Sequence, residues 1–417
     1  MSSALHIHIG GAGVMIGDML WKLYEKEYNE ATQNNYIYEE VDGNHYPLAV
    51  FIDSDDRMIH EVQRDKTVKF RKHSFLHGKE DASNYARGWN VGRELRDQGL
   101  DQTMDRLDEF VVTYSIIGGA GSGFGYEIMH NLSIDFGEKV NKKGFIIFPS
   151  SEMSNNVVGL YNAVLSIDTM TRYFDCITVF DNQSMYNAID HQLDLDFVDY
   201  QHLNNLVAQI ISSYTGLRRF SSYDNSKFIS HLCPYPMVHF LIPSYGQMTL
   251  INNYTRRELE QGQFIKYVTK KDQKLYQCPQ NPYHLSTTLL FRQKELDCFY
   301  GKQDLTLKNL DHCFGQRTNI IQCKSSNYQV LPELASMKQT GTFFSNDASI
   351  VSRLNLLNHQ FHKVYSKRAF VHWYVGDGLE EKIFCESFTE LDKLIYSYED
   401  LLILVNEPNE IYSNDEL

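Results

Sequence analysis

Five glycines lie within the eight residues Gly118-Gly-Ala-Gly-Ser-Gly-Phe-Gly125, directly after the apolar run 110–117. The run has the length and β-branched composition of a buried strand, and a helical pattern follows it over 125–134. Backbone amides of a glycine-rich turn between a strand and a helix can approach phosphate oxygens closely, and the helix dipole favours their negative charge. The segment predicts a phosphate-binding turn. For a single glycine cluster, a tight packing turn is an equally good explanation.

A second glycine turn, Gly10-Gly-Ala-Gly13, also lies between an apolar run (5–9) and a helical pattern (16–28). Two such turns at neighbouring strand ends would hold one polyphosphate from both sides, which favours binding over packing alone. The spacing differs from the GxGxxG fingerprint, so a dehydrogenase is a poor alternative that only binding of a reduced nicotinamide would support. The motif GxxxxGK[ST] is absent, which excludes an ordinary P-loop NTPase.

Further strand-sized apolar runs at 48–52, 144–148 and 176–180 alternate with helical patterns. Continuous apolar strands separated by helix-length segments are typical of a parallel sheet covered on both faces. The predicted fold class is therefore α/β, with an N-terminal doubly wound, mostly parallel sheet. Ligands of such sheets lie at the carboxyl ends of the strands, which places the chemistry in the loops after residues 9, 52, 117, 148 and 180.

The second half of the chain has its own patterns. Apolar residues recur at three- and four-residue steps over 200–218, which predicts a long central helix. Strand-sized runs at 237–242 and 285–291 predict a second, smaller α/β domain, and helical patterns at 355–365 and 388–405 predict C-terminal surface helices. The expected units are the nucleotide-binding domain 1–199, the core helix and following loop 200–239, the second α/β domain 240–352, and C-terminal helices with a short acidic tail, 353–417.

The 417-residue chain carries a formal net charge of -14, from 53 acidic and 39 basic residues, so a nucleic-acid backbone would be repelled. Its short basic segments, 66–72 and 363–368, have the pattern of solvated faces. The N-terminus lacks a signal-peptide pattern and no apolar run approaches the ~18 residues of a membrane span, so we expect a soluble intracellular protein with neither nucleic-acid nor membrane partners. An odd cysteine count without CxxC pairs predicts reduced thiols at Cys176, Cys233, Cys278, Cys298, Cys313, Cys323 and Cys385.

Three carboxylates follow the apolar run 48–52, in the segment Asp53-Ser-Asp-Asp56. A magnesium ion that bridges phosphates usually keeps several waters and takes one or two carboxylates. Asp53 and Asp55 are therefore candidates to hold Mg²⁺. A solvated aspartate-rich turn is the alternative when this segment is considered alone.

Several segments resemble the tubulin superfamily, and they occur in the order of that family. Gly10-Gly-Ala-Gly-Val-Met-Ile-Gly17 resembles its first nucleotide loop, Gly118 to Gly125 its GGTGSG signature, and Val157-Val-Gly-Leu-Tyr-Asn-Ala163 its VVEPYNA loop. The segments 233–240 (CPYPMVHF) and 368–378 (RAFVHWYVGDG) match as well. Several motifs in one order are far more specific than any single motif. The chain is identified as a divergent member of the superfamily over nearly its whole length.

The resemblance implies an N-terminal domain that binds GTP or GDP, with Mg²⁺ at Asp53 and Asp55. It also implies assembly with other tubulin subunits, of its own or another kind, in a cytoplasmic, microtubule-type cytoskeleton. Asn182 and Asn204 match the asparagines that read guanine, and Tyr200 matches the tyrosine that stacks on the base, roles that suit an amide and an aromatic ring. The matching phosphate-side positions are Gly10, Gly11, Ala12, Gly13, Ser115, Gly118, Gly119, Ala120, Gly121, Ser122 and Gly123.

The sequence departs from the family pattern around the nucleotide. Gly11 replaces a glutamine, Ala120 a threonine, Ile117 a small residue and Ser83 a phosphate-side asparagine, while Asn155 and Gly159 stand where two acidic residues hold the ribose hydroxyls. Loss of two hydrogen bonds to charged groups costs roughly 1.5–3 kcal/mol each. We therefore expect nucleotide binding that is weaker, or exchange that is faster, than in a standard family member.

In the family, hydrolysis of GTP is completed between subunits. Asp224 keeps the family's aspartate in the segment that approaches the neighbouring nucleotide, whereas Lys227 stands where an alpha-type subunit has its water-activating glutamate. A protonated ammonium cannot act as a general base. We expect that this chain does not trigger hydrolysis in a neighbour, although a partner can complete the site here.

Two segments that make side-by-side filament contacts in the family, 28–46 and 244–261, are shortened in this sequence. The tail 406–417 is acidic but lacks a long glutamate run. Packing as in a standard microtubule wall is therefore not expected. Together with the missing ribose carboxylates, these features leave a second hypothesis open, a cap or adaptor subunit that retains nucleotide with little or no turnover.

Overall fold

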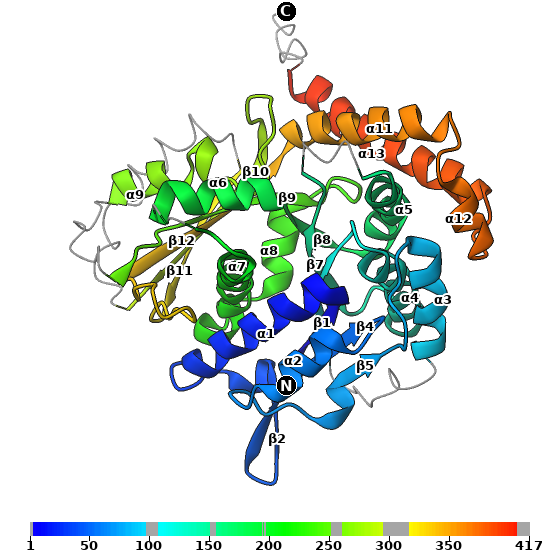
Figure 1. Cartoon of the computed structure of the whole chain (residues 1–417). Coiled ribbons are helices and arrows are strands. Elements are labelled where there is room, and N and C mark those ends of the chain that lie inside the picture. The colour runs from blue at the N-terminus through cyan, green and yellow to red at the C-terminus, as the bar shows by residue number, and fades with distance from the viewer. Residues whose placement is uncertain are drawn as a thin grey trace, which may run out of the picture.

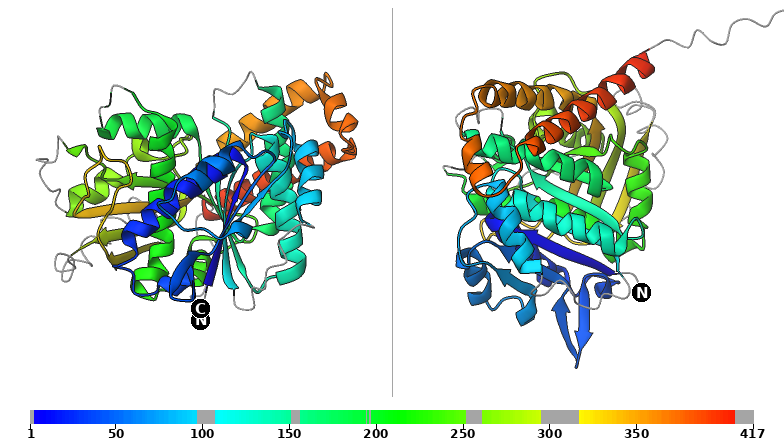
Figure 2. Two further views of the ribbon diagram at one scale, coloured as in Figure 1. Left: turned by 60° about the horizontal axis from the view of Figure 1, so that its bottom comes forward. Right: turned by 90° about the vertical axis from the view of Figure 1, so that its right-hand side faces the viewer.

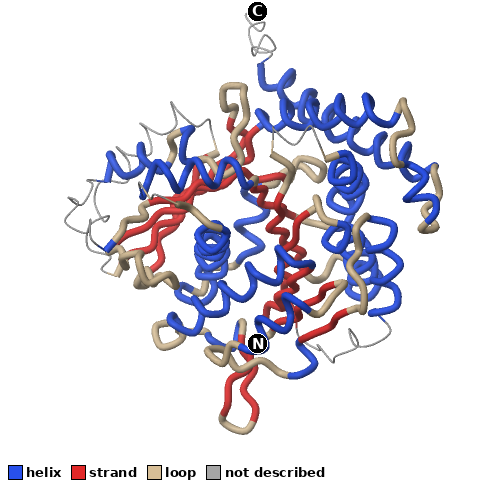
Figure 3. Tube along the Cα trace, viewed as in Figure 1, coloured by secondary structure: helices blue, strands red, loops and turns tan. Residues whose placement is uncertain are grey.

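The computed structural model describes residues 3–96, 107–150, 156–193, 195, 197–251, 261–294 and 317–406. Its described strands form one ten-stranded sheet, in the order β11-β10-β12-β9-β8-β7-β6-β1-β4-β5, and a separate two-stranded hairpin. The large sheet runs through the middle of the molecule with helices on both faces (Figures 1 and 3). The α/β class that the sequence predicts is confirmed.

The N-terminal half of the sheet is parallel throughout. Its strands are β1 (Ser3–Ile9), β4 (Ala49–Asp53), β5 (Phe75–His77), β6 (Leu107–Ser115), β7 (Asn141–Ile147) and β8 (Cys176–Phe180). The interior residues of β1, β6, β7 and β8 are buried almost without interruption, because a strand covered on both faces has no side that meets solvent. The doubly wound arrangement is therefore present.

Two hydrophobic clusters lie on opposite faces of the sheet. Within β6, Phe110 and Val112 belong to one cluster and Val111 to the other, as the alternation of side chains along a strand requires. The first cluster includes side chains of α3 (Tyr85–Arg96), α4 (Gly119–Phe136) and α5 (Val157–Tyr173). The second includes side chains of α1 (Gly10–Glu27), α2 (Arg57–Arg64), α6 (Asn182–Leu193), α7 (Tyr200–Ser221) and α8 (Asn225–Leu232).

The second α/β region continues the same sheet. Ile177 and Thr178 of β8 pair in parallel with Phe240 and Leu241 of β9 (Phe240–Gly246). β12 (Gln339–Asp347) then runs antiparallel between β9 and β10 (His284–Gln293), and β11 (Thr318–Lys324) is parallel to β10. α9 (Gln261–Val268) packs in a small third cluster on these strands. The predicted boundaries after 199, 239 and 352 stay predictions.

The remaining elements lie at the periphery. Figure 2 shows the C-terminal helices α11 (Val351–Tyr365), α12 (Val371–Gly376) and α13 (Lys382–Asn406) along one side of the molecule, where α11 and α13 cover α5. The hairpin of β2 (Tyr38–Val41) and β3 (Asn44–Pro47) projects at the opposite end. Short 3₁₀ helices are η1 (Asn34–Tyr36), η2 (Lys72–Ser74), η4 (Lys271–Gln273) and η5 (Ala348–Ile350).

α7 is the central helix predicted at 200–218. Asp199 caps its N-terminus by accepting from the amides of Gln201 and His202, and the helix is buried along most of its length. Near its C-terminal end, Arg219 donates to Glu27 of α1 at 2.8 Å, and Arg292 of β10 donates to the other oxygen of Glu27 at 2.7 Å. This buried ion cluster ties α1, α7 and β10 together.

Two predictions, on membrane spans and on thiols, concern the described residues. None of the helices there is long and apolar enough to cross a membrane. Cys176, Cys233, Cys278, Cys323 and Cys385 are free thiols, as predicted. Cys298 and Cys313 lie outside the described residues, as does the acidic tail after 406.

Candidate nucleotide-binding site

A cavity of about 370 Å³ opens at the carboxyl ends of β1, β4 and β6. It brings together both glycine segments and the aspartate pair predicted from sequence. The residues that line it are Ile9, Gly10, Gly11, Ala12, Asp53, Asp55, Arg57, Met58, Asp81, Ala82, Ser115, Ile117, Gly118, Gly119, Ala120 and Gly121. This is the edge of a parallel sheet at which ligands of doubly wound folds bind.

The two glycine segments are in direct contact. A Cβ atom at Gly10 would lie 3.0 Å from the amide nitrogen of Gly121, and Gly10 has a φ of +69° that a larger residue rarely adopts. Gly13 and Gly121 pack on backbone carbonyls of β6, where an added Cβ would lie 2.3 Å from the oxygens of Thr113 and Ser115 respectively. Close packing therefore explains several of the glycines, as the alternative of a tight packing turn proposed. The same packing forms the cavity.

The glycine segments are first turns of helices rather than loops. α1 begins at Gly10 and α4 at Gly119, earlier than the sequence pattern predicts, because glycine weakens the apolar periodicity from which the helix starts are inferred. Neither helix has a side-chain cap at its N-terminus. Amides of a first helical turn have no acceptor within the helix, so two sets of N–H donors and two helix dipoles meet at the cavity. The arrangement suits a polyanion.

Gly118 and Gly11 have space on the cavity side. A Cβ at Gly118 would meet no atom within 4 Å, and one at Gly11 would meet only Met58 Cγ at 3.6 Å and Asp53 Oδ2 at 3.8 Å. Ser122 and Gly123 lie further along α4, where the Ser122 hydroxyl donates to the carbonyl of Gly118 at 2.7 Å and Gly123 packs against α3. These two residues support the turn and do not line the cavity.

Asp53 and Asp55 differ in their surroundings. Asp53 is buried, and its Oδ1 accepts from the amide of Ser54 at 2.7 Å, while Oδ2 faces Gly11. Asp55 accepts from its neighbour Arg57 through both oxygens, at 3.0 Å from the amide and 2.6–2.9 Å from the guanidinium. In the described residues no group of three or more His, Cys, Asp or Glu side chains is placed to hold a metal. Asp53 fits a Mg²⁺ that takes most of its ligands from phosphate and water, whereas Asp55 fits one only if its pair with Arg57 opens.

Burial, with the nearby Asp55 and Asp81 carboxylates, raises the pKa of Asp53 from 3.8 to about 6. Between pH 4 and pH 6 the folded state therefore keeps a proton that the unfolded state has lost, so the metal-free protein loses stability as pH rises through this window, by roughly 2–3 kcal/mol. We expect Asp53→Asn to remove that loss and to stabilise the metal-free protein at pH 7. Thermal unfolding from pH 4 to 8 measures both effects.

The control for this prediction is Asp56→Asn, a change at an exposed neighbouring residue. The thermal stability of this variant should depend on pH in the same way as that of wild type. Millimolar Mg²⁺ with GTP should stabilise wild type at pH 7 and should stabilise Asp53→Asn less, because a cation favours the ionised carboxylate. An Asp53→Asn protein with the pH profile of wild type would contradict the assigned environment of Asp53.

None of the three residues predicted to read the base lines the cavity. Asn182 opens α6 directly after β8, and Tyr200 opens α7 with 66% of its surface exposed and its ring 6.4 Å from that of Tyr186. Asn204 follows one turn later on α7 and is half-buried. The C-terminal ends of α1 and α7 are joined through Glu27 and Arg219, so these packed helices both begin toward the carboxyl edge of the sheet.

One of the two positions matched to the family's ribose-binding carboxylates is described, and it carries no side chain. Gly159 is buried in α5, and its amide donates to the side chain of Asn156 at 2.8 Å. Asn155 lies outside the described residues. Ser83 is exposed, whereas Asn84 is buried, caps α3 by accepting from the amide of Arg87, and donates to Asp377.

Comparison with known proteins agrees with this geometry. Residues 3–190 match the family described as Tubulin/FtsZ family, GTPase domain. The chain is 33% identical to the tubulin alpha-2B chain of Physarum polycephalum over 443 aligned positions, which cover 96% of this chain and 97% of that protein. The alpha-1B chain of the same organism is 32% identical over the same coverage. The chain belongs to the tubulin family.

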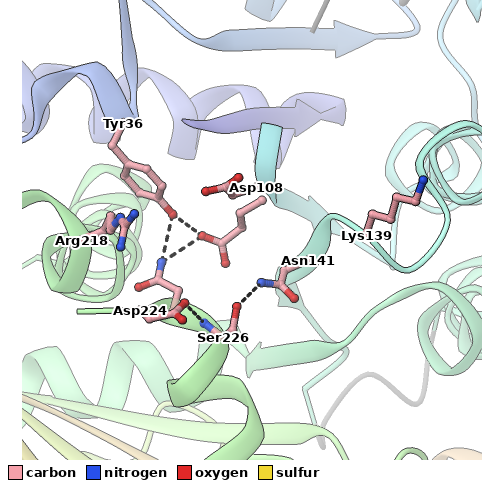
Figure 4. A pocket seen from close by; sticks show the side chains of 9 residues that line it. Tyr36, Asp108, Lys139, Asn141, Arg218, Asp224 and Ser226 are labelled. Atoms are coloured by element: carbon pink, nitrogen blue, oxygen red, sulfur yellow. Dashed lines mark hydrogen bonds between the residues drawn. The ribbon is translucent and has the colours of Figure 1, made fainter. Parts of the chain in front are cut away.

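Within this tubulin, Asp224 lies far from the glycine cavity. It is the exposed N-cap of α8, where its Oδ1 accepts from the amide of Ser226 at 3.0 Å. It lines a second pocket, shown in Figure 4, at the amino ends of β6 and β7. β6 has nine residues, so at about 3.3 Å per residue the two sites are roughly 25–30 Å apart. Asp224 therefore cannot reach the cavity of its own chain.

The second pocket contains a buried carboxylate that sequence patterns do not reveal. Glu109, at the start of β6, accepts hydrogen bonds from the hydroxyls of Tyr36 and Tyr214 and from the amide of Asn225 at 3.0 Å. Burial raises the pKa of Glu109. The three partners come from η1, α7 and α8, so only an apolar run that begins with two acidic residues marks the site in the sequence.

Proposed function

We propose that this tubulin binds GTP and Mg²⁺ at the glycine cavity and assembles head to tail, so that Asp224 of one subunit meets the nucleotide of the next. The supporting observation is that the cavity and Asp224 lie at opposite ends of the same strands. Contacts between unlike ends of identical subunits repeat as a filament when the rotation does not close. A cytoplasmic, cytoskeletal setting follows from this role.

The roles of the residues follow from their chemistry. The amides of the first turns of α1 and α4, with Ser115, hold the phosphates, and Asp53 shares the metal. Asn182 and Asn204 offer an amide donor and acceptor to the guanine edge, and the exposed ring of Tyr200 stacks on the base. Gly159 offers no side chain to the ribose, so we expect weaker binding than in tubulins with carboxylates there.

This chain is a poor activator, so we expect hydrolysis of its own GTP only where a subunit of another kind completes the site. Asp224 and Lys227 lie one turn apart at the exposed start of α8. Lys227 presents an ammonium where a general base is needed. When the end of this chain that carries Asp224 and Lys227 contacts a neighbouring subunit, the GTP of that neighbour should therefore be hydrolysed slowly.

A second candidate is a cap or adaptor subunit that keeps its nucleotide without turnover. The absence of a ribose-side carboxylate at Gly159 and the ammonium at Lys227 favour it. Both candidates require the cavity to hold GTP. They differ in whether the subunits form polymers.

Sedimentation velocity of the purified chain with GTP, with GDP and without nucleotide separates the two. We expect GTP-dependent growth into larger species, which Asp224→Arg should block without lowering the amount of bound nucleotide. A small complex of fixed size in all three conditions would support the cap or adaptor. Protein that carries no guanine nucleotide and shows no thermal shift with GTP would contradict both.

A further inference from the structure

One side of the glycine cavity is built from two backbone segments that touch. The segment 117–121 and residues 81–82 both line the cavity. A Cβ at Gly119 would lie 2.4 Å from the carbonyl oxygen of Ala82 and 2.4 Å from the amide nitrogen of Asn84. Because the two backbones are this close, a shift of either one changes the shape of the cavity.

A buried asparagine of α5 joins these two segments. Asn162 has no exposed surface, and its Nδ2 donates to the carbonyl of Ile117 at 2.9 Å. Its Oδ1 accepts from the amide of Tyr85, the first residue of α3, at 2.9 Å. An amide side chain can make both bonds because it carries a donor and an acceptor. Asn162 therefore fixes the start of α3 relative to the backbone just before Gly118.

Two residues of the C-terminal region reach the same segments. The hydroxyl of Tyr374, in α12, donates towards Oδ1 of Asn162 at 2.8 Å and towards the carbonyl of Val158 at 3.0 Å. Asp377, the C-cap of α12, accepts at Oδ2 from Nδ2 of Asn84 at 2.7 Å. α12 lies at the periphery of the molecule and packs against α3 (Figure 1). A surface helix thus supports both backbone segments through its side chains.

α12 itself depends on contacts with the rest of the fold. It has six residues, and its side chains Trp373 and Val375 are exposed. Isolated helices of this length are not stable in water, so tertiary contacts keep α12 folded. Among these contacts are the hydrogen bonds of Tyr374 and Asp377 to the segments beside the cavity. Order in the cavity and order in α12 therefore support each other.

We propose that Tyr374 and Asp377 are positioning residues for GTP. They hold the two segments that line one side of the cavity, and bound nucleotide in turn orders α12. Neither side chain lines the cavity, so both act on the nucleotide through the backbone. The coupling is reciprocal, because contacts that favour the nucleotide-bound form of the cavity are themselves favoured by the nucleotide. The inference rests on the proposed function, since it requires GTP to occupy this cavity.

Isothermal titration of the full-length chain with GTP tests the positioning role. Tyr374→Phe removes one hydroxyl and leaves Oδ1 of Asn162 bonded to the amide of Tyr85, so we expect this variant to fold. Its affinity for GTP should fall about three- to tenfold, which is the range for one hydrogen bond. Combining Tyr374→Phe with Asp377→Ala should lower the affinity further than either change alone. Thermal unfolding without nucleotide establishes that each variant is folded.

Two controls separate this role from a general effect of mutation. Tyr161 precedes Asn162 in α5 and is fully buried, and its hydroxyl has no hydrogen-bond partner in the part of the chain that the structure describes. Tyr161→Phe should therefore bind GTP as wild type does. Gly376→Val, in open space on α12, should do the same. Wild-type affinity in the folded Tyr374→Phe and Asp377→Ala double variant would overturn the inference.

Hydrogen exchange gives a readout that a purely structural role would not change. It is measured with and without saturating GTP, at a protein concentration at which sedimentation shows single subunits, so that contacts between subunits do not contribute. We expect GTP to slow exchange of the amides of 371–377 in wild type. The double variant should lose this protection even when saturated with GTP.

The wild-type experiment also keeps this inference apart from the proposed function. If wild type binds GTP but the exchange of α12 does not change, the coupling is wrong and the nucleotide site stands, whether or not the variants fold. If wild type binds no GTP, the proposed function and this inference fail together.

Discussion

Gly118→Val is expected to lower the affinity for GTP at least about 100-fold, close to 3 kcal/mol, without lowering thermal stability. Gly118 precedes α4 with extended backbone angles, φ -81° and ψ 152°, which valine adopts readily. A Cβ there meets no atom within 4 Å, so the fold tolerates the side chain. Because Gly118 lines the cavity, the added methyl groups occupy space that the phosphates need. Isothermal titration with GTP measures the affinity.

Two further glycine variants serve as controls. Gly121→Val should destabilise the protein itself, because its Cβ would lie 2.3 Å from the carbonyl oxygen of Ser115. Gly376→Val, at the open end of α12, should leave GTP affinity unchanged. Wild-type affinity in Gly118→Val would show that the phosphates bind elsewhere, even if the variant is fully folded.

Glu27→Gln should destabilise the protein by about 3–5 kcal/mol at pH 7, because it leaves two buried guanidinium groups without their counter-charge. Both oxygens of Glu27 also accept from the hydroxyl of Ser212, at 2.9 and 2.8 Å. The side chains of Glu27, Arg219 and Arg292 are at most 2% exposed, so solvent screens the charges little. Urea unfolding at pH 7 measures the loss.

The pH dependence gives a second check on Glu27. Burial opposes its ionisation, but Arg292 and Arg219 outweigh that cost and hold the pKa of Glu27 below 4.5. Its contribution is therefore present above the unfolded value of 4.5 and is lost as pH falls through the lower folded value. The stability difference between wild type and Glu27→Gln should shrink in acid. Glu40→Gln, at an exposed position of β2, is the control and should change stability by less than about 0.5 kcal/mol.

Much of the N-terminal fold could be predicted, because its signals are local. The apolar runs of β1, β6 and β8 were found within a few residues of their observed bounds, since strands covered on both faces are continuously apolar. Short or polar elements such as β5 and β11 were missed. A strand of three residues, or a strand that is only half-buried, has too weak a hydrophobic pattern to be recognised in the sequence. The glycine segments were predicted at the right strand ends, but as turns instead of helix starts.

The candidate site was predicted in part. The glycine segments and Asp53 were expected together and do line one cavity. The pairing of Asp55 with Arg57 was not expected, because two residues adjacent in a turn can interact or diverge according to side-chain rotamers. The carboxylate of Glu109 was also missed, since its partners Tyr36, Tyr214 and Asn225 are distant in the chain.

The amino-acid order alone established a parallel α/β protein of the tubulin family with phosphate-binding glycines, because hydrophobic periodicity and motif spacing are properties of short segments. Folding alone decided which distant groups meet. It brought Gly10 against Gly121, joined Glu27 to Arg292 across 265 positions, and set Asp224 at the far end of the strands from the cavity. Such contacts depend on how helices and strands pack in three dimensions, which no short segment encodes.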